Sequence, residues 1–106
     1  MTDAIIVYCT TSSMDEAKHI AEALVNEKLS ACVSIIPNVT SVYRWEGKLC
    51  TDYEITLMIK SRQPKLDQII NKIKELHSYQ VPEIIAAPIL GGSTEYLEWL
   101  LTETSD

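Results

Sequence analysis

The stretch that decides the fold is "ACVSIIPNVTSVYRWEGKLCTDYEITLMIK", which runs from Ala31 to Lys60. It opens with an apolar run of strand length, and after Pro37-Asn38 the extended pattern resumes through "VTSVYRW". Glu46-Gly47 supplies a turn, after which apolar and polar residues alternate through "DYEITLMIK". We therefore predict a β-hairpin. The proline predicts a break, a bulge or a sheet edge in its first strand.

The predicted hairpin is too long for its own domain. From Ala31 to Trp45 the extended pattern covers 15 residues, which at ~3.4 Å each spans on the order of 50 Å. A domain of this size is roughly 35 Å across. Either Pro37 folds the strand back, or the projecting part, which carries Tyr43, Trp45 and Tyr53, pairs with a neighbouring chain. Aromatic residues are enriched at interface cores, so we expect a closed symmetric assembly with Trp45 against a neighbour.

Shorter elements flank the hairpin on both sides. "AIIVYCT" predicts a buried strand, Ser13 and Glu16 form a capping box before a helix, and Pro64 opens a second helix. "PEIIAAPIL" predicts a short strand, and "TEYLEWLL" predicts a final amphipathic helix. The order βαββαβ indicates an α+β fold, a ferredoxin-like sandwich with strand order 4-1-3-2. We expect one domain over residues 1–106, with an extended hairpin and an extra C-terminal helix.

Charge and cysteine usage exclude several classes of partner. The chain has a net charge of −6, which argues against nucleic acid and against an anionic membrane surface. The N-terminal sequence lacks the basic region of a secretory signal, and no uncharged stretch approaches the ~20 residues that span a bilayer. The three cysteines are widely spaced, and no two of them form a C-x-x-C motif. We expect reduced thiols in a cytoplasmic protein.

Cys9 and His77 are the candidate metal ligands. Cys9 ends a buried strand and His77 lies on the apolar face of the second helix, whereas His19 lies opposite the apolar face of its own helix. A thiolate and an imidazole together suit copper or zinc. The alternative is structural, with a buried cysteine acting as a small hydrophobe and a histidine closing a helix.

Topology bears on whether these two residues share a metal. In the predicted sheet the first and third strands are parallel neighbours, so the second helix carries His77 about 20 Å away from Cys9. We then expect a site that spans two chains, or two separate weak sites. We also expect His77→Ala to leave the monomer fold intact and to change metal or ligand affinity only modestly. For the other thiols we expect Cys32 to be buried and Cys50, beside the hairpin turn, to be exposed.

Several polar and aromatic residues are candidates for a cleft between subunits. Acidic residues in an acidic chain are mostly solvated, and a lysine at a strand end has an ordinary structural reading, but together they mark one possible binding surface. The candidates are Trp45, Glu54, Lys60, Tyr79 and Glu83. The sequence contains no nucleophile–base pair close together and no motif that names a reaction, so we do not expect an enzyme.

The residues also resemble a known family. "LSACVSIIPNVTSVYRWEGKL", "HSYQVPEIIAAPI" and "YLEWL", with Cys9-Thr10 after the first strand, resemble CutA, the divalent-cation tolerance family, from about Ile5 to Leu101. The family usually reads His-Pro-Tyr where this chain has Ser78 in the middle position.

The resemblance implies a ferredoxin-like homotrimer, similar to the PII-like proteins, that responds to copper and other divalent metals in the cytoplasm. It also implies copper binding at the positions of Cys9 and His77. The alternative function is a PII-like signalling or scaffold module, whose clefts between subunits bind a small anionic ligand or a partner protein.

Overall fold

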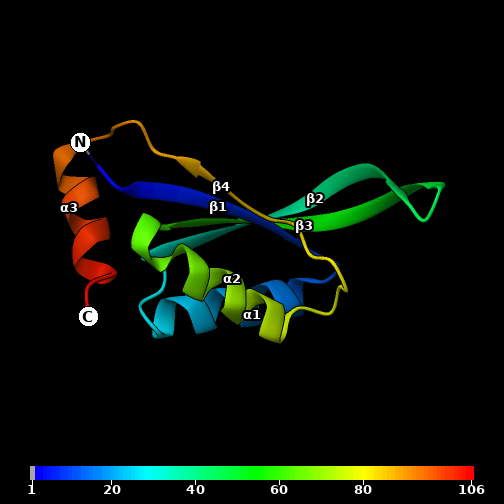
Figure 1. Ribbon diagram of the computed structural model, residues 1–106, viewed down its shortest axis with the longest axis horizontal. Helices are drawn as coiled ribbons and strands as arrows, with labels where there is room; N and C mark the ends of the chain where they lie inside the picture. The colour runs from blue at the N-terminus through cyan, green and yellow to red at the C-terminus, as the bar shows by residue number, and fades with distance from the viewer. Residues whose placement is uncertain (1) are drawn as a thin grey trace.

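Four strands form one antiparallel sheet in the order β2-β3-β1-β4 (Figure 1). The computed structural model describes residues 2–106. Its elements are β1 (Ala4–Thr11), α1 (Met14–Asn26), β2 (Cys32–Trp45), β3 (Lys48–Arg62), the 3₁₀ turn η1 (Gln63–Lys65), α2 (Leu66–Leu76), β4 (Ile84–Pro88) and α3 (Thr94–Glu103). The predicted ferredoxin-like sandwich, its strand order and its extra C-terminal helix are confirmed.

The core lies between the sheet and the two long helices. In Figure 1, α1 and α2 cover the same face of the sheet, and α3 lies at the end beside the N-terminus. Alternate side chains of β1 and β3 point into this layer and meet the apolar stripes of the helices, as the periodicities predict. The fully buried members include Val7, Cys9, Ile20, Leu24, Leu57, Ile59, Ile69 and Ile73.

The relative direction of β1 and β3 corrects one expectation. The two strands are antiparallel, with Ala4 opposite Arg62 and Thr11 opposite Ile55. The physical reason is the hairpin: a right-handed crossover through α1 makes β1 and β2 parallel, and the tight turn makes β3 run against both. Helix α2 therefore starts near the beginning of β1 and runs back toward its end.

The hairpin is continuous and contains the turn at Glu46-Gly47 and the irregularity at Pro37-Asn38 that the sequence suggested. Glu46 and Gly47 have φ of 49° and 78°, the signature of a two-residue type I′ turn. The pairing register shifts between Ile36 and Val39, so Pro37 and Asn38 form a bulge in an edge strand, where the missing N–H of proline costs no ladder bond.

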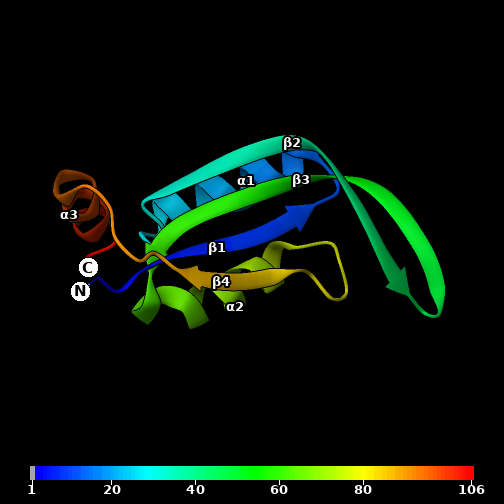
Figure 2. The same ribbon diagram turned by 90° about the horizontal axis from the view of Figure 1, so that it is seen from above.

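Beyond the bulge the hairpin extends past its neighbours as a two-stranded arm, defined here as residues 39–54 (Figure 2). The last β1–β3 pair is Thr11 with Ile55, so within the chain the arm pairs only with itself. It stretches the molecule to 44 × 25 × 22 Å. The arm leaves large side chains in solvent, Tyr53 at 79% and Leu49 at 76% exposure. An isolated two-stranded ribbon of this kind is marginally stable in water, and its exposed apolar side chains form a candidate contact surface.

No helix among the described residues is long and apolar enough to cross a membrane.

Candidate functional site

The end of α2 is joined to the end of β1 through His77. This residue is the C-cap of α2, and its side chain is fully buried. Its Nε2 lies 2.7 Å from the carbonyl oxygen of Thr10, and its Nδ1 lies 3.0 Å from the backbone N–H of Tyr79. A carbonyl oxygen only accepts, and an amide N–H only donates. A neutral ring with its proton on Nε2 therefore satisfies both bonds.

Cys9 lies against the same carbonyl group. Its side chain is fully buried, and its thiol donates to the carbonyl oxygen of Thr10 at 3.7 Å. The pKa of the Cys9 thiol is raised to about 12, mainly by burial and to a smaller extent by the carboxylates of Glu83, Glu16 and Glu54. The thiol is thus protonated at neutral pH.

The structure therefore brings Cys9 and His77 together within one chain, because both contact the oxygen of Thr10. The predicted separation of about 20 Å is wrong. It followed from taking β1 and β3 as parallel, whereas the antiparallel arrangement returns α2 to the end of β1. A metal shared by these two residues does not require a second chain.

Hydrogen bonds between Glu16 of α1 and Ser78 connect this helix to the loop after α2. Glu16 accepts the backbone N–H of Ser78 at 2.6 Å and its hydroxyl at 2.9 Å. The same carboxylate lies 3.4 Å from Nδ1 of His77. From the sequence we assigned Glu16 to the capping box, and its N–H does bond to the Ser13 hydroxyl. The contact with Ser78 spans 62 residues and has no local sequence signal.

Four of the five candidate cleft residues line one pocket of about 700 Å³, here called the acidic pocket. It lies between the arm and the loop that follows α2. Its walls are formed by Thr10, Ser41, Val42, Tyr43, Trp45, Asp52, Glu54, Ser78, Tyr79, Gln80, Val81 and Glu83. Lys60 is the exception, because its ammonium group instead contacts the Ser34 hydroxyl at 2.6 Å and the Cys32 sulfur at 3.8 Å.

Tyrosine hydroxyls orient two carboxylates of the acidic pocket. Tyr79 donates to Glu54 at 2.7 Å, and Tyr43 donates to Asp52. The bond to Asp52 is the main reason that the pKa of Tyr43 rises to about 12. Burial, followed by the bond to Glu54, raises the pKa of Tyr79. Both tyrosines therefore remain neutral hydrogen-bond donors at neutral pH.

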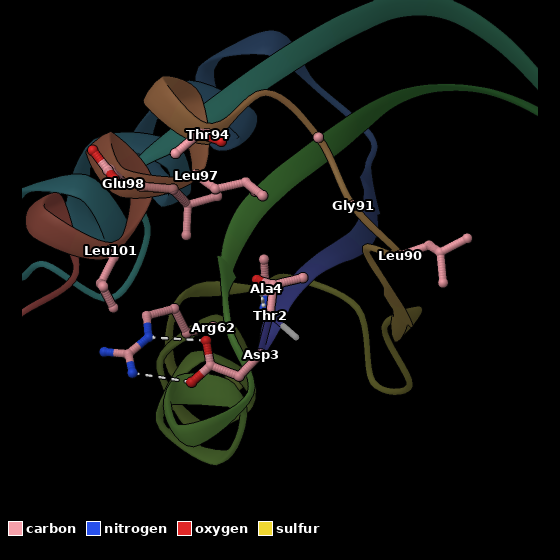
Figure 3. Close-up of a pocket in the computed structure, with 12 residues that line it drawn as sticks. Thr2, Asp3, Ala4, Arg62, Leu90, Gly91, Thr94, Leu97, Glu98 and Leu101 are labelled. Carbon is pink, nitrogen blue, oxygen red and sulfur yellow. Dashed lines mark hydrogen bonds and ion pairs between the residues drawn. The ribbon is translucent and has the colours of Figure 1, made fainter.

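A second pocket, of about 600 Å³, lies beside the N-terminus and α3 (Figure 3). Arg62 forms a two-bond ion pair with Asp3 there, through Nε at 3.2 Å and Nη2 at 3.0 Å. This pairing lowers the pKa of Asp3. The remaining wall includes four leucines, Leu90, Leu97, Leu100 and Leu101, and neither Cys9 nor His77 is part of it.

Within residues 2–106, no group of three or more histidines, cysteines and acids is arranged to hold a metal ion. The site consists instead of the Cys9–Thr10–His77 cluster and, beside Thr10, the acidic pocket. Metal ligation by Cys9 and His77 stays a prediction.

Comparison with known proteins places this site in a family. The family model described as CutA1 divalent ion tolerance protein matches residues 5–103. The chain belongs to the CutA1 family. The resemblance found in the sequence motifs is thereby confirmed, and divalent-cation tolerance is the role that gives the family its name.

Individual CutA1 relatives agree closely in sequence and fold. "Divalent-cation tolerance protein CutA" of Thermus thermophilus is 44% identical, over 93% of this chain and 96% of the relative. "Protein CutA 1, chloroplastic" of Oryza sativa is 47% identical over 97% of this chain. This chain spans only 58% of that rice protein. The solved rice CutA1 structure matches with a TM-score of 0.94 at 47% identity, covering 97% of this chain and 94% of that chain.

The three cysteines of this CutA1 chain differ less in solvent exposure than the sequence predicted. Cys9 is buried, while Cys32 and Cys50 are both half-buried. The expectation of a buried Cys32 is wrong because Cys32 alternates with Val33, which packs on the core, and so lies on the sheet face away from the helices.

Cys9 should be the least reactive thiol. Its pKa of about 12, against an ordinary 9.0, lowers the thiolate fraction at pH 7.5 by about a thousandfold. Mass spectrometry after brief treatment with iodoacetamide should find Cys50 modified and Cys9 intact. Folding raises the pKa of Cys9, so the protonated thiol makes its full contribution to the free energy of unfolding below pH 9. This contribution is lost as the pH rises toward 12. Labelling of Cys9 at the rate of Cys50 would contradict the assigned burial.

Proposed function

We propose that this CutA1 family member is a homotrimer that binds a divalent cation, with copper as the leading candidate. We also propose that its function is binding and not catalysis. The observation that carries the proposal is the meeting of the Cys9 thiol and the His77 imidazole at the carbonyl oxygen of Thr10. Sulfur and imidazole nitrogen are donors that suit copper and zinc. The family role in divalent-cation tolerance supports the same conclusion.

Copper binding would require two local changes in these residues. The Cys9 thiol must release its proton. Nε2 of His77 must leave Thr10 and lose its proton while Nδ1 gains one, so that Nδ1 no longer accepts the Tyr79 N–H. Glu16, 3.4 Å from Nδ1, is placed to accept that N–H, the outer-shell arrangement that commonly orients a metal-bound histidine. Affinity should therefore rise with pH, since the thiol is protonated at neutral pH.

The trimer is supported by the surface that one chain leaves uncovered. In the arm, Val42, Tyr43 and Trp45 are exposed, and in the sheet itself Ile36 of β2 and Ile85 of β4 are exposed. Isolated chains rarely leave so many large apolar groups in water. Symmetric closure would cover the arms without leaving a free end.

Calorimetric titration of copper and zinc into the native assembly tests the metal proposal. Cys9→Ser should lower copper affinity by at least tenfold, and Glu16→Gln by about tenfold, the usual effect of losing an outer-shell partner. Cys50→Ser is the matched control and should bind like the unmodified protein. Equal affinities of the Cys9 and Cys50 variants would contradict the proposed site.

A second candidate function is a PII-like module that binds a small anion or a partner protein. Lys60 favours it, because its half-buried ammonium contacts a hydroxyl and a thiol and pairs with no carboxylate in residues 2–106. A panel of nucleotides in the same calorimetric experiment separates the two candidates. Nucleotide binding that Lys60→Gln abolishes would favour the signalling module.

We also propose a cytoplasmic location. It is supported by the three unpaired cysteines, which suit a reducing compartment.

A further inference from the structure

We propose that the acidic pocket binds a linear organic cation with more than one ammonium group. This inference does not rest on the copper proposal, since neither Cys9 nor His77 lines the pocket. Three properties of the pocket carry it: its unbalanced charge, its aromatic walls, and the spacing of its carboxylates within a large volume.

The lining is negatively charged without compensation. Asp52, Glu54 and Glu83 contribute carboxylates, and no lysine, arginine or histidine is among the lining residues. None of the three forms an ion pair with a basic side chain in residues 2–106. Glu54 is also 8% exposed, so its charge lies at the inner wall. A cation entering the pocket would meet an attractive field that the protein itself does not neutralise.

Aromatic rings complete the walls. Tyr43 and Trp45 come from the arm, and Tyr79 comes from the loop after α2. Ring faces attract ammonium groups and also pack against alkyl carbons, and tryptophan is the strongest partner. Rings offer little to a hydrated metal ion, so their presence beside carboxylates selects an organic cation.

The volume of the acidic pocket and the separation of its carboxylates favour an organic ligand over a metal ion. The pocket of about 700 Å³ is in the range that holds a small organic molecule. Its carboxylates do not converge on one point, since no group of three acids, histidines and cysteines in the described chain could hold a metal. Glu54 and Asp52 each already accept a tyrosine hydroxyl. Separated charges around an aromatic surface fit a chain with separated ammonium groups.

Spermidine is a suitable probe, and Trp45 provides the signal. Trp99→Phe leaves Trp45 as the single tryptophan, so spermidine added to the native assembly of this variant should change its fluorescence saturably. A neutral diol of matched length should produce no change. Magnesium at equal charge should not displace spermidine. Failure of spermidine to bind to the native assembly would overturn the proposal.

Two neutral variants test the charges. Asp52→Asn and Glu83→Gln should each weaken spermidine binding by about fivefold, the scale of one partly exposed ion pair. Glu22→Gln, on the exposed face of α1, is the control and should leave the affinity unchanged. Affinities unaffected by both pocket variants would refute the inference. Cys9→Ser should impair copper binding and leave spermidine binding intact, so failure of one proposal is distinguishable from failure of the other.

Discussion

Replacing residues 40–53 with Asn-Gly should convert the proposed trimer to a monomer. Val39 and Glu54 face each other in the hairpin, six residue pairs before Trp45 and Lys48, which flank the natural turn. The even number of steps preserves the pair type, so a two-residue turn closes the shortened hairpin without changing its register. The core contacts of the sheet and helices remain, and the exposed aromatic groups of the arm are removed.

Light scattering coupled to size-exclusion chromatography measures the outcome. Trp45→Ala is a milder version and should weaken assembly by roughly 2 kcal/mol or more if Trp45 is an interface anchor. Leu49→Ala, also on the arm and more exposed than Trp45 in the single chain, indicates whether apolar area alone matters. A shortened protein that remains trimeric would show that the arm does not hold the assembly together.

His77→Ala should destabilise the fold by about 2–4 kcal/mol, through a buried cavity and two lost hydrogen bonds. The ring is fully buried and joins the end of β1 to the loop after α2 through Thr10 and Tyr79. From the sequence we expected this variant to leave the fold unaffected. That expectation assumed a histidine far from β1, and the antiparallel arrangement of β1 and β3 removes its basis.

The other histidine provides a matched control. His19 is exposed on α1, so His19→Ala should change the free energy of unfolding by less than about 0.5 kcal/mol. His77→Phe keeps most of the ring volume but loses both hydrogen bonds, which separates the cavity from the bonding contribution. Urea denaturation at one fixed protein concentration is the measurement, because assembly makes stability depend on concentration. Equal stability of the two alanine variants would contradict the assigned role.

Most of the fold could be predicted from the sequence, because the relevant sequence signals are local. Alternation through "DYEITLMIK" located β3, Glu46-Gly47 located the turn, and Pro64 indicated the start of the second helix. The long hairpin followed from counting residues against the size of a domain. Even the direction of β3 was available, because the crossover through α1 and the tight turn between β2 and β3 determine it. The error lay in treating β1 and β3 as parallel.

The site was less predictable because its contacts are distant in sequence. His77 and Thr10 are 67 residues apart, and Tyr79 and Glu54 are 25 apart. Of the proposed cleft residues, Lys60 lies outside the acidic pocket because the pleat directs it toward Cys32 and Ser34 on the open face of the sheet. Asp52 and Tyr43 complete the pocket only because the arm is long enough to face the loop after α2.

X-ray absorption at the copper edge, recorded on the native assembly loaded with one equivalent of copper per chain, tests the proposed donor set most directly. We predict a first shell that contains one sulfur from Cys9 and one imidazole from His77. In Cys9→Ser the sulfur should disappear, while Cys50→Ser should retain it. A shell made only of oxygen and nitrogen in the unmodified protein would contradict copper binding at the Cys9–Thr10–His77 cluster.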